Sequence, residues 1–121
     1  MTATEAVARL RSREISPLDL VEASIQRIEA VDSKVNALPI HCFEQARSQA
    51  KSFDYMAHSD NPKSLCGLPI AVKDYNDLGG ALTTYGSPIF SKNVVKKSDA
   101  TVRQLETNGA IGIAKSNVPE W

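Results

Sequence analysis

The stretch Gly67-Leu68-Pro69-Ile70-Ala71-Val72-Lys73-Asp74 decides how the rest of the sequence is interpreted. Leu68 to Val72 is a run of small and branched apolar residues, which is the pattern of a strand buried on both faces. Pro69 suits the first residues of such a strand, where no ladder donor is needed. The run stops at Lys73, and a parallel sheet would place this residue at its carboxyl edge, where ligands and catalytic groups gather. We therefore expect a buried strand that ends on a functional lysine.

Composition excludes several classes of function. The 121 residues carry 14 basic and 14 acidic side chains, so no electrostatic footprint for nucleic acid is present. The sequence has no apolar run of membrane-spanning length and no signal peptide, which argues against a membrane partner. Cys42 and Cys66 are too few for a disulfide framework or a metal cluster. A cytoplasmic protein is the expectation.

Residues 1–60 read as a mostly helical arm. A short helix is expected over residues 4–13, and Ser16-Pro17 begins a second helix that should end near Asp32. Asn36 to Ile40 fits either a short strand or an extended link. Apolar residues at helical spacing predict a third helix from Phe43 to Ala57.

Residues 61–121 read as the start of an α/β core. After Lys73 comes a long loop without periodicity, of the kind that is often functional. Ser98 is expected to cap the next helix, with Val102 and Leu105 facing inward and a stop at Asn108-Gly109. A second buried strand, Ile111 to Ala114, then ends on Lys115. Two strands separated by a helix predict the beginning of a parallel sheet.

Several motifs follow one another in the order of a known family. They are Gly67 to Asp74, Thr83-Thr84-Tyr85-Gly86-Ser87, Asp99-Ala100-Thr101-Val102, Gly109 to Asn117, and Glu120-Trp121. Over essentially its whole length the sequence resembles the amidase signature family. The resemblance implies an α/β fold: an N-terminal helical arm followed by the first strands and helix of a mixed, mainly parallel sheet. On this view residues 1–121 are the N-terminal part of a single amidase domain, which is incomplete.

The resemblance also implies a function, namely hydrolysis of the C–N bond of a small carboxylic amide by a Ser–cis-Ser–Lys triad. No metal or organic cofactor is implied. Lys73 matches the catalytic lysine, and Thr84, Tyr85, Gly86 and Ser87 are expected to wall a substrate pocket. The family's two serines belong to a Gly/Ser-rich segment that nothing here matches. We therefore expect residues 1–121 alone to be inactive and marginally stable.

The chemistry explains why a lysine would be used. A serine hydroxyl attacks an amide poorly unless a neighbouring base takes its proton. A lysine can be that base only when neutral, and burial among apolar groups favours the neutral form. The strand Leu68 to Val72 is expected to provide this environment. Strand alternation places Lys73 and Asp74 on opposite faces, so Asp74 need not hold Lys73 charged.

Two further hypotheses about the parent protein stay open. One is the glutaminase-type A subunit of an amidotransferase, which would release ammonia from glutamine for a partner. The other is a non-catalytic, truncated relative that serves as a binding module. The resemblance also leaves open a homodimer that forms through the N-terminal helices.

Other motifs are better explained structurally. Gly109 to Ser116 is one residue away from a P-loop, but a helix precedes it and a strand follows, which is the wrong order for phosphate binding. Ser48 and Lys51 match an S-x-x-K pattern on a helix face that we expect to be solvated. The neighbours His41 and Cys42 should point apart. We expect Cys66 to be buried, and His58 to be solvated.

Overall fold

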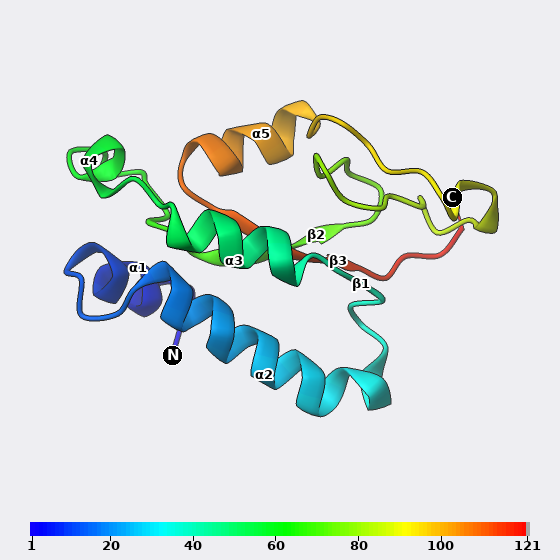
Figure 1. Ribbon diagram of the computed structural model, residues 1–121, viewed down its shortest axis with the longest axis horizontal. Helices are drawn as coiled ribbons and strands as arrows, with labels where there is room; N and C mark the ends of the chain where they lie inside the picture. Colours follow the sequence, from blue (N-terminus) through cyan, green and yellow to red (C-terminus); the bar gives the residue numbers. More distant parts are fainter. Residues whose placement is uncertain (121) are drawn as a thin grey trace.

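The computed structural model describes residues 1–120, in which a short sheet runs between two groups of helices (Figure 1). Helices α2 and α3 pack on one face of the sheet, and α5 packs on the other. No helix among these residues is both long enough and apolar enough to cross a bilayer. In chain order the elements are α1 (Ala3–Arg11), α2 (Pro17–Val35), β1 (Ile40–His41), α3 (Phe43–Lys51), α4 (Tyr55–His58), β2 (Pro69–Lys73), the 3-10 turn η1 (Pro88–Phe90), α5 (Ala100–Thr107) and β3 (Ile111–Ser116).

Helix α2 begins as predicted but runs past its expected end near Asp32. The Ser16 hydroxyl accepts from the backbone N–H of Asp19, and the Asp19 carboxylate accepts from the backbone N–H of Ser16, which makes a capping box. The helix stops at Asn36, whose left-handed conformation (φ 54°) supplies the C-terminal cap. The predicted end near Asp32 is therefore too early, because asparagine readily adopts the left-handed conformation that ends a helix.

The prediction of one helix from Phe43 to Ala57 is wrong. Helix α3 ends at Lys51, and a separate short helix, α4, begins at Tyr55. Asp54 causes the break, because its side chain accepts from the backbone N–H groups of Met56 and Ala57 and caps a new helix there. The chain between the two helices is held by Phe53, whose ring packs against Tyr55.

The three strands form a mixed sheet in the order β1-β3-β2, and this confirms the predicted fold class. β2 runs parallel to β3, whereas β1 runs antiparallel to it. The register of the parallel pair shifts between Ile70 and Ala71, because Ile113 is an extra residue in β3. Such a bulge turns every later residue of its strand to the opposite face. Beyond it, Val72 pairs with Lys115 and Lys73 pairs with Ser116.

The core lies on both faces of β3 but on only one face of β2. One cluster joins α2 and α3 to β3, and a second lies between the sheet, α5 and the loop after β2. Within β2, Val72 is buried whereas Ala71 and Lys73 are exposed. The prediction that this strand is buried on both faces is therefore wrong for residues 1–120. The physical reason is that β2 is the edge strand and the helices cover its neighbour β3.

Helix α5 is capped by Asp99 and not by the predicted Ser98. The Asp99 carboxylate accepts from the backbone N–H of Val102, while the Ser98 hydroxyl accepts from the backbone N–H of Gly79. Val102 is buried as predicted, but Leu105 is 39% exposed. Ser98 therefore anchors the long loop to the start of α5 instead of capping the helix.

Gly67 gives a test of the way β2 is attached to the helical arm. Its φ of +91° is unfavourable for other residues, and an added Cβ would lie 2.5 Å from Cγ of Pro17. We expect Gly67→Ala to lower the free energy of unfolding by roughly 2–4 kcal/mol, measured by urea unfolding of the 121-residue chain.

Gly80→Ala is the matched control for this substitution. Gly80 has a similar φ of +84°, but its added Cβ would meet the flexible end of the Gln45 side chain. The control should lose only about 1 kcal/mol, which is the cost of the backbone strain alone. Equal losses in the two variants would contradict the role given to the Pro17 contact.

Candidate active site

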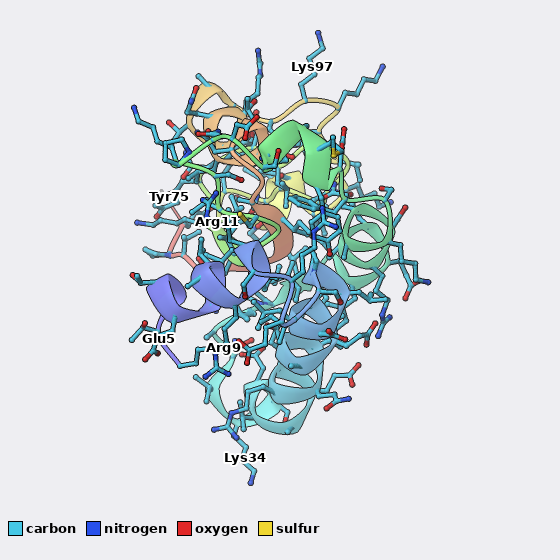
Figure 2. The ribbon with its side chains drawn as sticks, turned by 90° about the vertical axis from the view of Figure 1, so that its left-hand side faces the viewer. Glu5, Arg9, Arg11, Lys34, Tyr75 and Lys97 are labelled. Atoms are coloured by element: carbon cyan, nitrogen blue, oxygen red, sulfur yellow. The ribbon has the colours of Figure 1, made fainter. Side chains whose placement is uncertain are left out.

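Lys73 lies at the carboxyl end of β2, as predicted, but its side chain is exposed. Its ammonium lies 5.0 Å from the centre of the Tyr75 ring, which Figure 2 places at the surface of the molecule. Within residues 1–120, no carboxylate lies within ion-pair distance of it. The apolar environment expected around this lysine is therefore absent from the described part of the chain. The predicted position of Lys73, at the end of a parallel strand, is confirmed.

Lys115 is the lysine that is buried, and the sequence alone assigns it no role. Its side chain is completely shielded from solvent, and its ammonium donates to Oδ1 of Asp74 at 2.8 Å. The ammonium also donates to the carbonyl of Asn76 at 2.8 Å and to the hydroxyl of Thr83 at 3.1 Å. All three hydrogens of a lysine ammonium are thus used.

The bulge in β3 explains why the two lysines lie on opposite faces of the sheet. Without the extra residue Ile113, Lys115 would pair with Lys73 and share its face. Gly112, just before the bulge, was the signal in the sequence, because a glycine inside a strand often marks a bulge. The closeness of Asp74 to Lys115 could have been inferred only from the shifted register.

Asp74 connects this ion pair to the segment predicted to wall a substrate pocket. Its carboxylate accepts from the backbone N–H of Thr84 and from the Thr84 hydroxyl. That hydroxyl in turn accepts from the backbone N–H of Gly86 at 3.2 Å. The buried carboxylate is therefore satisfied from two sides, by β3 and by the loop after β2.

The other residues of this segment make specific contacts of their own. The Tyr85 hydroxyl donates to Asp77 at 2.7 Å, and this hydrogen bond to a carboxylate raises the pKa of Tyr85. The Ser87 hydroxyl donates to Glu120 at 2.6 Å. Gly86 has φ +74°, and a Cβ there would lie 2.4 Å from the carbonyl oxygen of Pro119. The chain at 117–120 thus packs closely over the segment.

A hollow of about 300 Å³ lies beside this segment. Thr84, Gly86 and Ser87 line it, but Tyr85 and Lys73 do not. Its other lining residues are Pro39, Ile40, Asp74, Pro88, Ser91, Asn117 and Val118. The described residues therefore bring three of the predicted pocket residues together, on the Asp74 side, and leave the predicted catalytic lysine outside.

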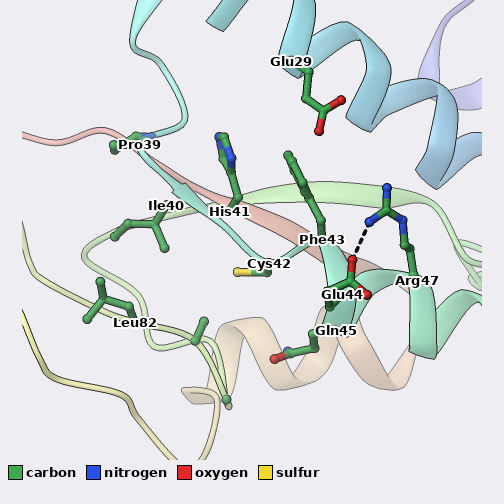
Figure 3. A pocket seen from close by; sticks show the side chains of 12 residues that line it. Glu29, Pro39, Ile40, His41, Cys42, Phe43, Glu44, Gln45, Arg47 and Leu82 are labelled. Carbon is green, nitrogen blue, oxygen red and sulfur yellow. Dashed lines mark hydrogen bonds and ion pairs between the residues drawn. The ribbon is translucent and has the colours of Figure 1, made fainter. Parts of the chain in front are cut away.

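A larger open groove, of about 800 Å³, lies between α2, the start of α3 and the loop at 80–82 (Figure 3). The rings of His41 and Phe43 stack within it, with their centres 4.4 Å apart, and Glu29 of α2 extends toward them. Cys42 faces away into the core, and burial raises the pKa of its thiol. His41 and Cys42 thus point apart as predicted, and the groove holds no paired nucleophile and base among the described residues.

The remaining candidates have structural roles. His58 is half-buried rather than solvated, because its ring stacks on Phe53 and its Nδ1 lies 2.8 Å from the Ser64 hydroxyl. Cys66 is buried, as predicted. Ser48 and Lys51 lie on α3, where Lys51 is exposed as predicted. Among residues 1–120, no cluster of three or more His, Cys, Asp and Glu side chains has the geometry to hold a metal ion.

Comparison with known proteins decides the family. The model of the Amidase family matches residues 19–121, which is most of the chain. The chain belongs to the amidase signature family. It is 35% identical, over 100% of its length, to the A subunit of the glutamyl-tRNA(Gln) amidotransferase of Psychrobacter cryohalolentis, and covers 24% of that protein. It is 40% identical, over 84% of its length, to the putative amidase AmiB2 of Mycobacterium bovis, and covers 22% of it.

Solved structures of amidase signature enzymes have the same arrangement. The 6-aminohexanoate cyclic dimer hydrolase superposes on 99% of this chain with a TM-score of 0.83 at 26% identity, over 24% of its own length. The native peptide amidase of Stenotrophomonas maltophilia superposes on 100% of the chain with a TM-score of 0.85, over 25% of its own length. At 24% identity, the second likeness concerns the fold alone. The chain thus spans about a quarter of the length of the relatives it matches.

The two lysines can be compared directly by the same substitution. Lys73→Met should change the free energy of unfolding by less than about 1 kcal/mol, because an exposed cation–π contact is worth little. Lys115→Met should cost about 3–5 kcal/mol, because it leaves the Asp74 carboxylate buried and unpaired. Urea unfolding of the 121-residue chain measures both values. Similar losses in the two variants would contradict the assignment of Lys115 as the buried partner.

Proposed function

We propose that the protein to which residues 1–121 belong is an amidase, which hydrolyses the C–N bond of a small carboxylic amide. Membership of the amidase signature family supports a hydrolase of this class. Lys73 is proposed as the base of a Ser–cis-Ser–Lys triad, and Thr84, Tyr85, Gly86 and Ser87 as residues near the substrate. The two serines would come from a Gly/Ser-rich segment that residues 1–121 do not contain.

The observation that carries the proposal is the pairing of Asp74 with Lys115. Asp74 directly follows Lys73, and a free carboxylate so near would favour the charged ammonium. In the structure this carboxylate points to the other face and is neutralised by a second lysine at 2.8 Å. Lys73, at the end of a parallel strand, is left without a carboxylate partner among residues 1–120. This arrangement suits a lysine that has to act as a base.

The proposed reaction has two stages. The neutral amine of Lys73 accepts the proton of the bridging cis-serine, which takes the proton of the nucleophilic serine as it attacks the amide carbonyl. The proton returns to the leaving nitrogen as the C–N bond breaks, and an acyl-enzyme and a free amine or ammonia result. Water then attacks the acyl carbonyl and gives a proton to Lys73 by way of the cis-serine. The ester bond to the nucleophilic serine breaks, the proton returns to that serine, and the acid leaves.

A glutaminase-type A subunit is the second candidate for the same chemistry. Its support is that several relatives are glutamyl-tRNA(Gln) amidotransferase A subunits, at 35% and 38% identity in two bacterial species. The two candidates differ in substrate and in assembly. Release of ammonia from glutamine, together with co-purification of a second protein, supports the amidotransferase, whereas turnover of simple amides by the protein alone supports an amidase.

Other parts of the proposal concern the setting of the reaction. We propose a cytoplasmic protein, with residues 1–121 as the N-terminal part of one amidase domain, and a homodimer through the N-terminal helices α1 and α2. A truncated relative acting as a binding module is the alternative without catalysis.

Lys73→Ala tests the proposed base in the complete polypeptide that the gene encodes. We expect amide hydrolysis to fall by at least about 10³-fold with the melting temperature unchanged, because the substitution removes a unit of the triad and little packing. Ammonia release measures the activity. Substantial turnover in the variant would remove Lys73 from the mechanism.

Purified residues 1–121 provide a second test. Because they lack a match to the serine segment, they should hydrolyse no simple amide above the rate in buffer. Hydrolysis by this chain, abolished by Lys73→Ala, would mean that the nucleophile lies within it. A contaminating hydrolase is recognised because its activity would survive that substitution.

A further inference from the structure

The end of β2 is held on the side away from Lys73. The backbone N–H of Asp74 donates to the carbonyl of Ser116 at 3.2 Å, which extends the parallel ladder past the end of the strand. The Asp74 side chain then enters the core and meets the Lys115 ammonium. The residue that follows the proposed base is thus fixed by both its backbone and its side chain.

Lys115 also fixes the loop that leaves β2. Its ammonium donates to the carbonyl of Asn76, near the start of the loop, and to the hydroxyl of Thr83, further along it. Asp74 holds Thr84 through the backbone N–H and the hydroxyl. One buried pair therefore ties three parts of the chain together: the end of β2, the end of β3 and the segment beside the 300 Å³ hollow.

Stability alone is a poor explanation for this pair. Removing two charges from water costs about as much as their attraction returns, and a well-packed apolar pair often serves as well or better. An ion pair differs from apolar packing because its hydrogen bonds are directional, so they restrict the relative orientation of the two side chains. At the end of β2 these bonds hold residue 74, which directly follows Lys73 in the chain.

We propose that Asp74 and Lys115 are positioning residues for Lys73: the buried pair fixes the strand end from which the catalytic base projects. The inference rests on the proposed function of Lys73. Neither residue is a reacting group in the proposed mechanism, although Asp74 lines the 300 Å³ hollow, and the pair acts on Lys73 through the backbone of residues 73 and 74. The bulge at Ile113 is required for this arrangement, because it puts Lys115 on the face opposite to Lys73.

The double variant Asp74→Asn/Lys115→Met, in the complete polypeptide, separates positioning from stability. It leaves no unpaired buried charge, and the introduced amide oxygen can still accept from the backbone N–H of Thr84. We expect its melting temperature to recover most of what Lys115→Met alone loses. Its kcat should stay about 10–100-fold below the parent, with KM within about threefold, because small misplacements of a catalytic group are costly.

Asp74→Glu keeps both charges but lengthens one arm of the pair by a methylene, so it provides a second test that does not depend on the first. We expect kcat to fall at least about fivefold, while the far-UV circular dichroism spectrum stays unchanged.

Glu22→Gln is the matched control, because it breaks the Glu22–Arg47 ion pair on the helical arm, far along the chain from β2. Its kcat should equal that of the parent.

Each result has one meaning. If the folded double variant or Asp74→Glu keeps kcat within twofold of the parent while Lys73→Ala is inactive, the pair is structural and the inference is overturned. If the double variant does not fold, Asp74→Glu decides alone by the same criterion. Full turnover in Lys73→Ala would instead overturn the proposed function, whatever the other variants do.

Discussion

The buried ion pair between Asp74 and Lys115 is the interaction on which the second half of the chain depends. Lys115 is fully shielded from solvent, and an isolated ammonium there would be prohibitively costly. Its cost is offset because Asp74, Asn76 and Thr83 use its three hydrogens. Each of these partners lies directly after β2 or in the loop that follows it. The loop between β2 and α5, which has little regular structure, is thereby ordered around a point in the strand next to it.

The same pair gives the two strand-ending lysines different properties. Both follow apolar runs and look alike in the sequence, yet one is buried and paired, and the other is exposed and free of carboxylates among residues 1–120. A single extra residue in β3 makes the difference, since a shift of one position exchanges the faces of a strand. The Asp74 carboxylate is thus paired with Lys115 and not with Lys73.

The sequence predicted the elements that depend on local patterns. The helix start at Ser16, the parallel pairing of two apolar strands and the position of Lys73 at a strand end all follow from residue type and spacing. It failed where a polar side chain binds a backbone group that the apolar pattern does not reveal, whether close by or far along the chain. Asp54 starts a new helix instead of continuing the old one, and Ser98 binds Gly79 and leaves the cap to Asp99. The environment of Lys73 was mispredicted because hydrophobicity along a strand does not tell which neighbour covers it.

The exposure of Lys73 is consistent with a role as base once position and environment are treated separately. Position comes from residues 1–120: the ladder to β3, the bulge and the buried pair fix where the side chain begins. Environment depends on what covers the open face of β2, and this chain spans about a quarter of the length of its relatives. A bare ammonium in solvent is a poor base, whereas one enclosed by apolar groups and without a carboxylate loses its charge more readily. The carboxylate of the residue that follows Lys73 is already paired with Lys115 on the other face, so it does not compete for the proposed base.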